Sequence, residues 1–544
     1  MTPTPLARVR IQLDGQPVNV AAGSSVAAAL AARSPGNSRI SVTGENRAAV
    51  CGMGICHECR VLIDGQLRLA CQTPCQQGMR IETVLDHGTR AASAGAPFLE
   101  SHDDICDLLI IGAGPAGMAA ALAAAPSGRA IVVVDDNPAP GGQIWRDGPG
   151  VTLPDSAKRQ REQLARHTNI RLRCGTRVAG LAGKPGSSAL LLEDARQGWV
   201  QHYGSLILCT GARELLLPFP GWTLPGVTGA GGLQALIKGG MAVRGQRIVI
   251  AGSGPLLLAA AQSARHAGAT VVRIAEQAAW PALLRFSGSL ARWPGKAVQA
   301  AALFHPQYRG ASHVLEAGGD GRLQHVRLRR GRQVEQLACH RLACGFGLVP
   351  NTQLGQMLGC ALNAHNGLQV DDLLQTGVPG VYAAGECTGV GGSERASIQG
   401  AIAGYAAIGE LARATRLAPR LARWQAFANT LRRHFSLGPP VRALARPDTL
   451  VCRCEDVPQS ALAGCDGWID AKLHTRCGMG ACQGRVCGAA TQALYGWRPM
   501  PSRHLLAPTR IDTLAGLGLH DGHAPAPTTT RCADAADSPN KEPQ

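Results

Sequence analysis

The alternation of apolar and polar side chains predicts a small β-rich domain at the N-terminal end of the chain. Residues 8–13 (RVRIQL) and 16–20 (QPVNV) lie on either side of a DG dipeptide, which is typical of two strands joined by a tight turn. Residues 24–33 (SSVAAALAAR) predict a helix capped by one of the two leading serines. Residues 58–65 (ECRVLIDG) predict a further strand.

A different pattern occurs twice in the middle of the chain, where a short apolar run passes through closely spaced glycines into a helical stretch. It occupies residues 107–125 (DLLIIGAGPAGMAAALAAA) and residues 246–276 (QRIVIAGSGPLLLAAAQSARHAGATVVRIAE). Strand, glycine-rich turn and helix in this order are typical of nucleotide-binding units in a parallel sheet. The pattern predicts an α/β core with two dinucleotide-binding domains.

Length, composition and charge narrow the class of protein. The chain has 544 residues, too many for one hydrophobic core, and its 45% hydrophobic residues are ordinary for a globular protein. It has no apolar run of the ~18 residues that a membrane span requires, and its first residues lack the apolar core of a signal peptide. We therefore expect a cytoplasmic protein that meets the inner membrane only through partners.

The formal charge of +17 accompanies only 4% aromatic residues and no basic run with interleaved aromatic side chains. A solvated surface is therefore expected rather than a nucleic-acid partner, while an acidic protein partner stays open.

Nineteen cysteines in a reducing compartment indicate metal ligation rather than disulfides. The first group has the spacing Cys51-x4-Cys56-x2-Cys59-x11-Cys71, which is the plant-type pattern for a [2Fe–2S] cluster. Two glycines within the loop let the backbone wrap closely and turn its N–H groups toward the sulfurs. With the neighbouring strands and helix, this group resembles a β-grasp ferredoxin domain.

Two further residues near this loop have a simpler interpretation. Cys75 follows the fourth cysteine closely and is interpreted as a spare thiol. His57 lies inside the loop, where it is expected to face solvent, although it could also tune a cluster by hydrogen bonding.

The first glycine-rich motif contains every part that nucleotide binding needs. Gly112 makes the tight turn, Gly114 admits a pyrophosphate, and Gly117 lets helix and strand pack closely. The helix N-terminus then faces the phosphates with the positive end of its dipole. Asp135 ends the next apolar strand, 18 residues beyond Gly117, where its carboxylate can accept the ribose hydroxyls.

The second glycine-rich motif is incomplete. Gly252 and Gly254 match, but Leu257 occupies the position of the third glycine. Glu276 ends the following strand, where it could bind a ribose. NAD, another adenine nucleotide and an unoccupied remnant all stay open for this motif.

Residues 105–435 resemble the flavoproteins with two dinucleotide-binding domains, the disulfide-reductase-like class. The resemblance rests on three stretches, DDNPAPGGQIW with Gln143, LILCTGAREL with Thr210, Gly211 and Ala212, and VYAAGECTG with Gly385 and Glu386. It implies FAD as cofactor, with Glu386 in a position where that class usually has Asp. The only CxxC pair is Cys56 and Cys59, inside the first cysteine loop, so electrons from the flavin are expected to reach iron rather than a thiol pair.

A second group of cysteines lies near the C-terminal end. Cys452-x-Cys454 and the stretch CGMGACQGRVC resemble the small [2Fe–2S] domain of the bacterioferritin-associated ferredoxin (BFD) type. That resemblance implies Cys452, Cys454, Cys482 and Cys487 as ligands and leaves Cys477 without a role. A rival assignment uses Cys477 in place of Cys487, and zinc is the alternative metal, since four thiolates suit it as well.

The whole chain resembles the α subunit of heteromeric FAD-dependent amino-acid and amine dehydrogenases. These include D-hydroxyproline dehydrogenase, opine oxidase, hydrogen cyanide synthase and the sarcosine oxidase α subunit, and here the small ferredoxin is expected to be fused at the N-terminus. The resemblance implies FAD, two [2Fe–2S] clusters, a substrate-oxidising flavoprotein partner acting on CH–NH donors, and a respiratory electron acceptor. The alternative is an NAD(P)H-dependent ferredoxin-type reductase that is complete in itself.

The expected fold is α/β and multidomain. The predicted boundaries run from a β-grasp [2Fe–2S] domain to a polar tail: 1–90 ferredoxin-like, 91–104 linker, 105–225 FAD-binding, 226–345 inserted second dinucleotide domain, 346–435 FAD-binding again, 436–520 BFD-like [2Fe–2S] domain, and 521–544 disordered tail.

Overall fold

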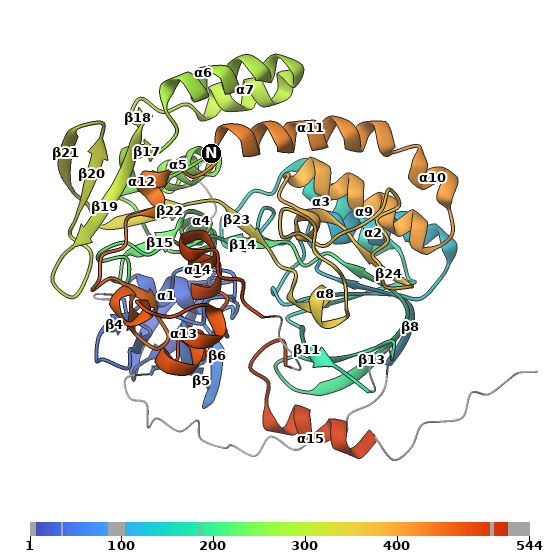
Figure 1. Ribbon diagram of the computed structural model, residues 1–544. Helices are drawn as coiled ribbons and strands as arrows, with labels where there is room; N and C mark the ends of the chain where they lie inside the picture. The colour runs from blue at the N-terminus through green and yellow to red at the C-terminus, as the bar shows by residue number, and fades with distance from the viewer. Residues whose placement is uncertain (1–6, 34–35, 85–103, 184–186, 501–504, 521–544) are drawn as a thin grey trace, which may run out of the picture.

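The computed structural model describes residues 7–33, 36–84, 104–183, 187–500 and 505–520. Most of the predicted linker 91–104 and all of the predicted tail 521–544 lie outside these residues. The FAD-binding domain fills one side of the molecule, and the N-terminal domain, the second dinucleotide domain and the C-terminal cysteine segment fill the other (Figure 1).

The N-terminal domain is a five-stranded sheet in the order β2-β1-β7-β5-β6, crossed by one helix. Strands β1 and β2 pair antiparallel through the predicted turn, and β7 pairs parallel to β1. The N-cap of the helix is Ser25, whose hydroxyl accepts a hydrogen bond from Ala28 N at 3.2 Å. The elements are β1 (Arg8–Leu13), β2 (Gln16–Ala21), α1 (Val26–Ala31), β3 (Arg39–Ile40), β4 (Asn46–Arg47), β5 (Arg60–Ile63), β6 (Gln66–Leu69) and β7 (Arg80–Thr83).

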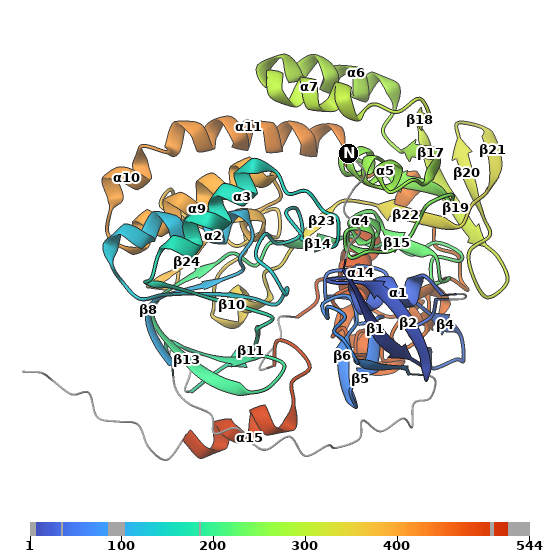
Figure 2. The same cartoon turned by 180° about the vertical axis from the view of Figure 1, so that it is seen from behind.

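The FAD-binding domain is built on a sheet in the order β10-β9-β8-β13-β12-β11, with β24 also paired to β13. Helices α2 and α9 pack together on one face of this sheet (Figure 2). The elements are β8 (Asp104–Ile111), α2 (Pro115–Ala124), β9 (Ile131–Asp135), α3 (Asp155–Arg166), β10 (Ile170–Cys174), β11 (Arg177–Leu181), β12 (Ala189–Glu193), β13 (Gly198–Leu208), α8 (Gln353–Met357), β24 (Val381–Ala383), α9 (Ser393–Ala407), α10 (Leu411–Thr415) and α11 (Ala418–His434).

The second dinucleotide domain is an insertion in the first. The chain enters and leaves it through β14 (Ala212–Glu214) and β23 (Leu348–Pro350), which pair with each other. Its parallel sheet has the order β15-β22-β16-β17-β18, and β19-β20-β21 form a small antiparallel sheet beside it. The elements are β15 (Val227–Gly229), α4 (Ala230–Lys238), β16 (Arg247–Gly252), α5 (Leu256–His266), β17 (Thr270–Glu276), α6 (Trp280–Ser289), α7 (Pro294–Leu303), β18 (Tyr308–Arg309), β19 (Ser312–Gly318), β20 (His325–Arg330), β21 (Gln333–Ala338) and β22 (Arg341–Gly345).

The C-terminal cysteine unit is smaller than the predicted range 436–520. Val441, on α12, packs into the core of the second dinucleotide domain, and α15 packs on β13 of the FAD-binding domain. What lies between is a compact unit around Trp468 and the cysteines. The elements are α12 (Pro439–Arg442), β25 (Leu450–Cys452), β26 (Val457–Pro458), α13 (Trp468–Thr475), α14 (Cys487–Tyr495) and α15 (Ile511–His520).

Buried charges join the cysteine unit to the N-terminal domain. Arg47 Nη2 lies 2.8 Å from Asp456 Oδ1, and the two side chains are 2% and 0% exposed. The hydroxyl and backbone N–H of Thr43 donate to the other oxygen of the same carboxylate at 2.7 and 3.1 Å. The two ends of the chain therefore form one packed body. Within the described residues, no helix combines the length and the apolar character that crossing a bilayer requires.

Substituting Asp456→Ala would leave the Arg47 charge buried without its partner. We expect the free energy of the first unfolding transition to fall by about 3–5 kcal/mol, measured by denaturant titration. The double variant Arg47→Met, Asp456→Leu should recover most of this loss. Asp470→Ala, which removes an exposed partner of His474, should change it by less than about 1 kcal/mol. An equally small effect of Asp456→Ala would contradict this account of the interface.

Candidate functional site

One cavity of about 420 Å³ gathers the predicted FAD-binding residues at the carboxyl ends of β8, β9 and β13. Nine of the ten line it. They are Gly112, Gly114, Asp135, Gln143, Thr210, Gly211, Ala212, Gly385 and Glu386. The tenth, Gly117, lies beneath the turn, where a Cβ would overlap the carbonyl oxygen of Gly112. Its role in close packing is thus the one its position in the motif indicates.

The turn between β8 and α2 has the geometry that a pyrophosphate needs. Gly112 has φ +108°, and a side chain there would overlap the carbonyl of Cys209 on the neighbouring strand. Gly114 is the N-cap of α2 and carries no side-chain cap, so the first N–H groups of that helix stay available to an anion. A flavin nucleotide fits this turn.

Two adjacent acids border the cavity, although only one was predicted. Asp135 Oδ2 accepts from Ala113 N at 2.6 Å and its Oδ1 accepts from Asn137 N at 2.8 Å, while burial raises its pKa to about 6. Asp136, which sequence analysis missed, lines the same cavity, and burial raises its pKa too. Because Asp135 is engaged by its own turn, Asp136 is a second candidate for the ribose. The consecutive acids in the sequence were the available signal.

The N-terminal domain forms part of the wall of this cavity. Met53, Gly54, Ile55 and His57 of the cysteine loop line it, together with Gln72. The Gln72 side chain hydrogen-bonds the Asp136 carboxyl and so opposes the effect of burial on the pKa of that acid. Cofactor binding therefore involves two domains.

His57 is buried, and the expectation that it faces solvent is wrong. It is 4% exposed and lines the cavity. Burial, aided by the charge of Arg485, lowers its pKa to about 3. The cysteine loop therefore contributes a neutral imidazole to the wall of the flavin cavity.

The first four cysteines lie in two contacting pairs, and their role as the ligands of one cluster stays a prediction. All four are buried, and Cys51 and Cys59 lie in hydrogen-bonding contact with Cys56 and Cys71 respectively. The backbone N–H groups of Met53 and Cys56 donate to Cys51 Sγ, each at 3.4 Å. Four thiols with N–H donors aimed at a sulfur suit a [2Fe–2S] cluster, which carries one electron when bound.

The loop is held against the core of the flavoprotein. Gly52 has φ +64°, and a Cβ there would lie 2.6 Å from the Cβ of Ala235 on α4. A larger residue at position 52 would push the cysteines away from the flavin cavity.

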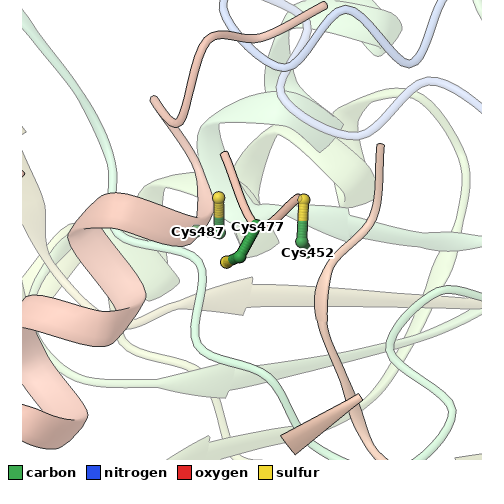
Figure 3. A group of neighbouring side chains, drawn as sticks. All are labelled: Cys452, Cys477 and Cys487. Carbon is green, nitrogen blue, oxygen red and sulfur yellow. The ribbon is translucent and has the colours of Figure 1, made fainter. Parts of the chain in front are cut away.

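The second cysteine group brings five thiols together rather than four. The sulfur atoms of Cys452, Cys477 and Cys487 all lie within 4.8 Å of one another (Figure 3). Cys454 and Cys482 are in hydrogen-bonding contact with each other. Cys477 therefore lies among the other thiols, and both the choice of Cys452, Cys454, Cys482 and Cys487 as the ligands and the rival choice with Cys477 stay predictions.

The two cysteine groups face each other across a small cavity. It is bordered by Cys56 and Glu58 from the first group and by Cys452, Arg453 and Cys454 from the second. Glu58 accepts from Arg39 Nη2 at 2.8 Å and from Arg453 Nε at 3.3 Å, and all three side chains are at most 3% exposed. The sequence places Glu58 and Arg453 between pairs of cysteines but gives no sign that they meet.

Several cysteines outside the two groups are buried. Cys75 is buried, and burial raises its pKa to about 12, as suits a spare thiol. The isolated cysteines are also buried: Cys209, Cys339, Cys344, Cys360 and Cys387.

The second glycine motif is covered by the chain itself. Ser253 Oγ donates to the carbonyl oxygen of Phe435 at 3.1 Å, and Gln277 Nε2 donates to that of Ser436 at 2.8 Å. The Phe435 ring is 3.7 Å from the position a Cβ on Gly254 would take. Segment 435–438 thus lies over the turn that would face a pyrophosphate.

In the second glycine motif, Glu276 and Leu257 both make contacts within the same domain. Glu276 is fully buried and accepts from Gly254 N at 2.7 Å and Ala278 N at 2.8 Å. Leu257 packs against Gly345 on β22, where the missing side chain makes room for it. Leu257 therefore does not force helix and strand apart.

Glu214 is a further acid of the FAD cavity that the sequence did not reveal. Its carboxylate accepts from Gly231 N at 2.7 Å and Gly232 N at 3.0 Å, at the N-terminus of α4. Burial raises its pKa to about 7, against the effect of these hydrogen bonds. It is a buried group that can hold or release a proton near neutral pH.

Fold and site together define a FAD-dependent oxidoreductase that carries at least one [2Fe–2S] domain. Residues 106–409 match the model of the pyridine nucleotide-disulphide oxidoreductases, and the chain belongs to that family. Residues 7–85 match the 2Fe-2S iron-sulfur cluster binding domain, which confirms the predicted ferredoxin-like domain.

Two curated relatives each match about 70% of this chain. The HcnB component of the hydrogen cyanide synthase of Pseudomonas aeruginosa is 34% identical over 430 residues, 70% of this chain and 90% of HcnB. One subunit of the opine oxidase of Rhizobium meliloti is 31% identical over 429 residues, 71% of this chain and 92% of its relative. HcnA of P. aeruginosa is 46% identical over 82 residues, 14% of this chain and 79% of HcnA. The predicted resemblance to these subunits is confirmed.

A solved structure has the same overall fold. L-proline dehydrogenase from P. horikoshii superposes with a TM-score of 0.68 at 18% identity, over 94% of this chain and 98% of that one. The likeness extends beyond the flavoprotein core, so the arrangement of the terminal units relative to the core has a counterpart in a known protein.

Substitutions of Cys56 and of Cys75 should distinguish a cluster ligand from a thiol that binds no iron. We expect Cys56→Ser to abolish the [2Fe–2S] signal of the N-terminal domain in electron paramagnetic resonance (EPR) spectra of the reduced protein. Cys75→Ser, an equally buried substitution, should leave that signal intact. Loss of the signal in both variants, or in neither, would contradict the ligand assignment.

Glu214 should make stability depend on pH. Its folded pKa of about 7 is raised above the ordinary 4.5, so its proton stabilises the fold below pH 4.5 and that contribution is lost as pH rises through 7. The free energy of unfolding of the wild type relative to Glu214→Gln should therefore fall by about 3 kcal/mol between pH 4.5 and pH 8. If the free energies of unfolding of the wild type and of Glu214→Gln change in parallel with pH across this range, the Glu214 carboxyl has an ordinary pKa and the prediction is wrong.

Proposed function

We propose that this chain is the electron-transfer subunit of a heteromeric amino-acid or amine dehydrogenase. It would receive electrons from a substrate-oxidising flavoprotein subunit that acts on CH–NH donors, and deliver them to a respiratory acceptor. The observation that carries the proposal is the continuity of flavin cavity, first cysteine group and second cysteine group in one packed body.

Residues shared between neighbouring sites support an electron path from the flavin to the first cysteine group and then to the second. Met53 and Ile55 of the first cysteine loop border the flavin cavity, and Cys56 of the same loop borders the cavity shared with the second group. A flavin can accept two electrons together and release them singly, whereas a [2Fe–2S] cluster takes one at a time. A second [2Fe–2S] cluster, bound by four of the five C-terminal cysteines, would extend the path away from the flavin.

Buried positive charge suits two anionic clusters at close range. Arg39 and Arg453 share one carboxylate, that of Glu58, so the space between the two groups holds an excess of positive charge. Arg485 lies between Cys482 and Cys487 in the sequence and lines the flavin cavity, and burial lowers its pKa. These cations would compensate the charge of thiolate-bound iron and of the flavin phosphates.

The names of the relatives support a role within a complex. HcnB and HcnA are named as separate subunits of hydrogen cyanide synthase, and the R. meliloti relative is named as one subunit of an opine oxidase. The HcnA match is about as long as the N-terminal domain, so this chain would combine what P. aeruginosa divides between two subunits. A partner that binds the substrate would then complete the enzyme.

The alternative of an NAD(P)H-dependent ferredoxin-type reductase is less well supported. That activity requires a nicotinamide nucleotide at the second glycine motif. The backbone carbonyls of Phe435 and Ser436 accept hydrogen bonds from residues at this motif. The Glu276 carboxylate accepts a hydrogen bond from Gly254 N within the motif. Opening the site would break these contacts before a nucleotide could enter.

Anaerobic reduction of the purified chain tests the proposal. The chain, isolated under argon, should contain one FAD and about four irons, and an excess of NADH or NADPH should leave its flavin oxidised. Addition of the partner subunit with its amine substrate should bleach the flavin and produce cluster signals. Rapid turnover of an amine by the chain alone, or rapid bleaching by NAD(P)H, would overturn the division of roles. Zinc in place of iron in the C-terminal unit would remove the second cluster.

A further inference from the structure

A second cavity in the molecule is as large as the flavin cavity and has no assigned ligand. It measures about 400 Å³, against about 420 Å³ for the flavin cavity. It lies where α1 of the N-terminal domain meets the amino ends of β15, β16 and β22. The labels of α1, β15 and β22 lie near one another in both views (Figure 2). Gly254 and Glu276 are at the opposite, carboxyl edge of the same sheet, so this cavity is separate from the second glycine motif.

The described residues that line this cavity include basic side chains but no carboxylate. The basic residues are Arg33, Arg247, Arg322, Arg341 and His340. Arg33 forms an ion pair with Asp14 at 3.0 Å, and Arg322 also has an interaction partner. Neither side chain is therefore counted as an available anion ligand. The balance of charge around the cavity favours an anion.

Arg341 is held in place by neutral groups. Its Nε donates to Gln246 Oε1 at 2.7 Å, and its Nη2 donates to the carbonyl oxygen of Ala31 at 3.0 Å. Burial lowers its pKa to about 10, and no described carboxylate forms an ion pair with it. A half-buried guanidinium that is oriented by uncharged partners lacks the counter-ion that would offset its partial desolvation.

Thr228 supplies an unused polar atom in the same wall. It is 2% exposed, its hydroxyl has no hydrogen-bond partner among the described residues, and it lines the cavity. Buried hydroxyls are rarely left unpaired, because the lost hydration costs free energy. The remaining wall is mixed: Leu30, Leu236 and Leu323 form its apolar part, beside the polar side chains of Ser38 and Gln324. A ligand that satisfies this cavity has an anionic group and an apolar body.

We propose that this cavity binds a small organic anion, with its phosphate or carboxylate group facing Arg341 and Thr228 and its apolar body against the leucines. Cys59, a predicted ligand of the first cluster, borders the cavity. The charge of the bound anion therefore lies beside that cluster and makes its reduction harder. The ligand also spans the joint between the N-terminal domain and the second dinucleotide domain. The site is independent of the identity of the partner subunit.

Calorimetric titration of the full chain, loaded with FAD and iron, tests the site. The probes are adenosine monophosphate and benzoate, which combine an anionic group with an apolar body, and inorganic phosphate, which lacks the body. We expect at least one of the organic probes to bind one to one and more tightly than phosphate. Thr228→Val should weaken that binding about tenfold or more, since it removes only the hydroxyl. Arg341→Met should have at least the same effect.

The matched control is Arg285→Met, an exposed arginine on α6 that lies outside the cavity lining, and it should leave binding unchanged. Retained FAD absorbance shows that each variant is folded. Saturation with the probe should also lower the reduction potential of the first cluster, followed by EPR during a redox titration. No binding by the wild type, binding unaffected by Thr228→Val, or an unchanged potential would each overturn the proposal.

Discussion

The structure depends on one buried carboxylate, that of Glu58, and on the two arginines that share it. Arg39 comes from the N-terminal domain and Arg453 from the C-terminal unit, more than four hundred residues away along the chain. A buried charge without its partner is costly, so each domain needs the other to satisfy these groups. The same residues lie next to predicted cluster ligands, which means that the contact joining the domains also fixes the distance between the two cysteine groups.

This constraint explains why the N-terminal domain is part of the flavoprotein rather than an appendage. Its cysteine loop packs on α4 through Gly52 and forms one wall of the flavin cavity through Met53 and Ile55. On its other side, Cys56 faces the C-terminal cysteines. A domain with both contacts has little freedom to move, and the proposed electron transfer within the chain would require no docking step.

Sequence predicted what spacing and periodicity encode. The glycine turns, the acid at the end of β9, the capped first helix and the loop with Cys51, Cys56 and Cys59 all lie where their local patterns place them, since these features are set by neighbours along the chain. Contacts between distant segments leave no such pattern, so Gln72, Glu214 and the approach of Glu58 to Arg453 were missed. The burial of His57 was misjudged for the same reason, because burial depends on tertiary packing. Phe435, which covers the second glycine motif, is far from that motif along the sequence, so the motif itself gave no sign of it.

The most direct test of the central claim is the magnetic interaction expected between the two proposed clusters when both are reduced. The protein is reduced anaerobically with dithionite, and its EPR spectrum is compared with those of Cys56→Ser and Cys454→Ser. If two [2Fe–2S] clusters face each other across Glu58 and Arg453, the wild-type spectrum contains two signals that are split or broadened by spin coupling, and each variant shows a single sharp signal. A wild-type spectrum equal to the sum of the two variant spectra, or one that contains only one cluster, would contradict the account.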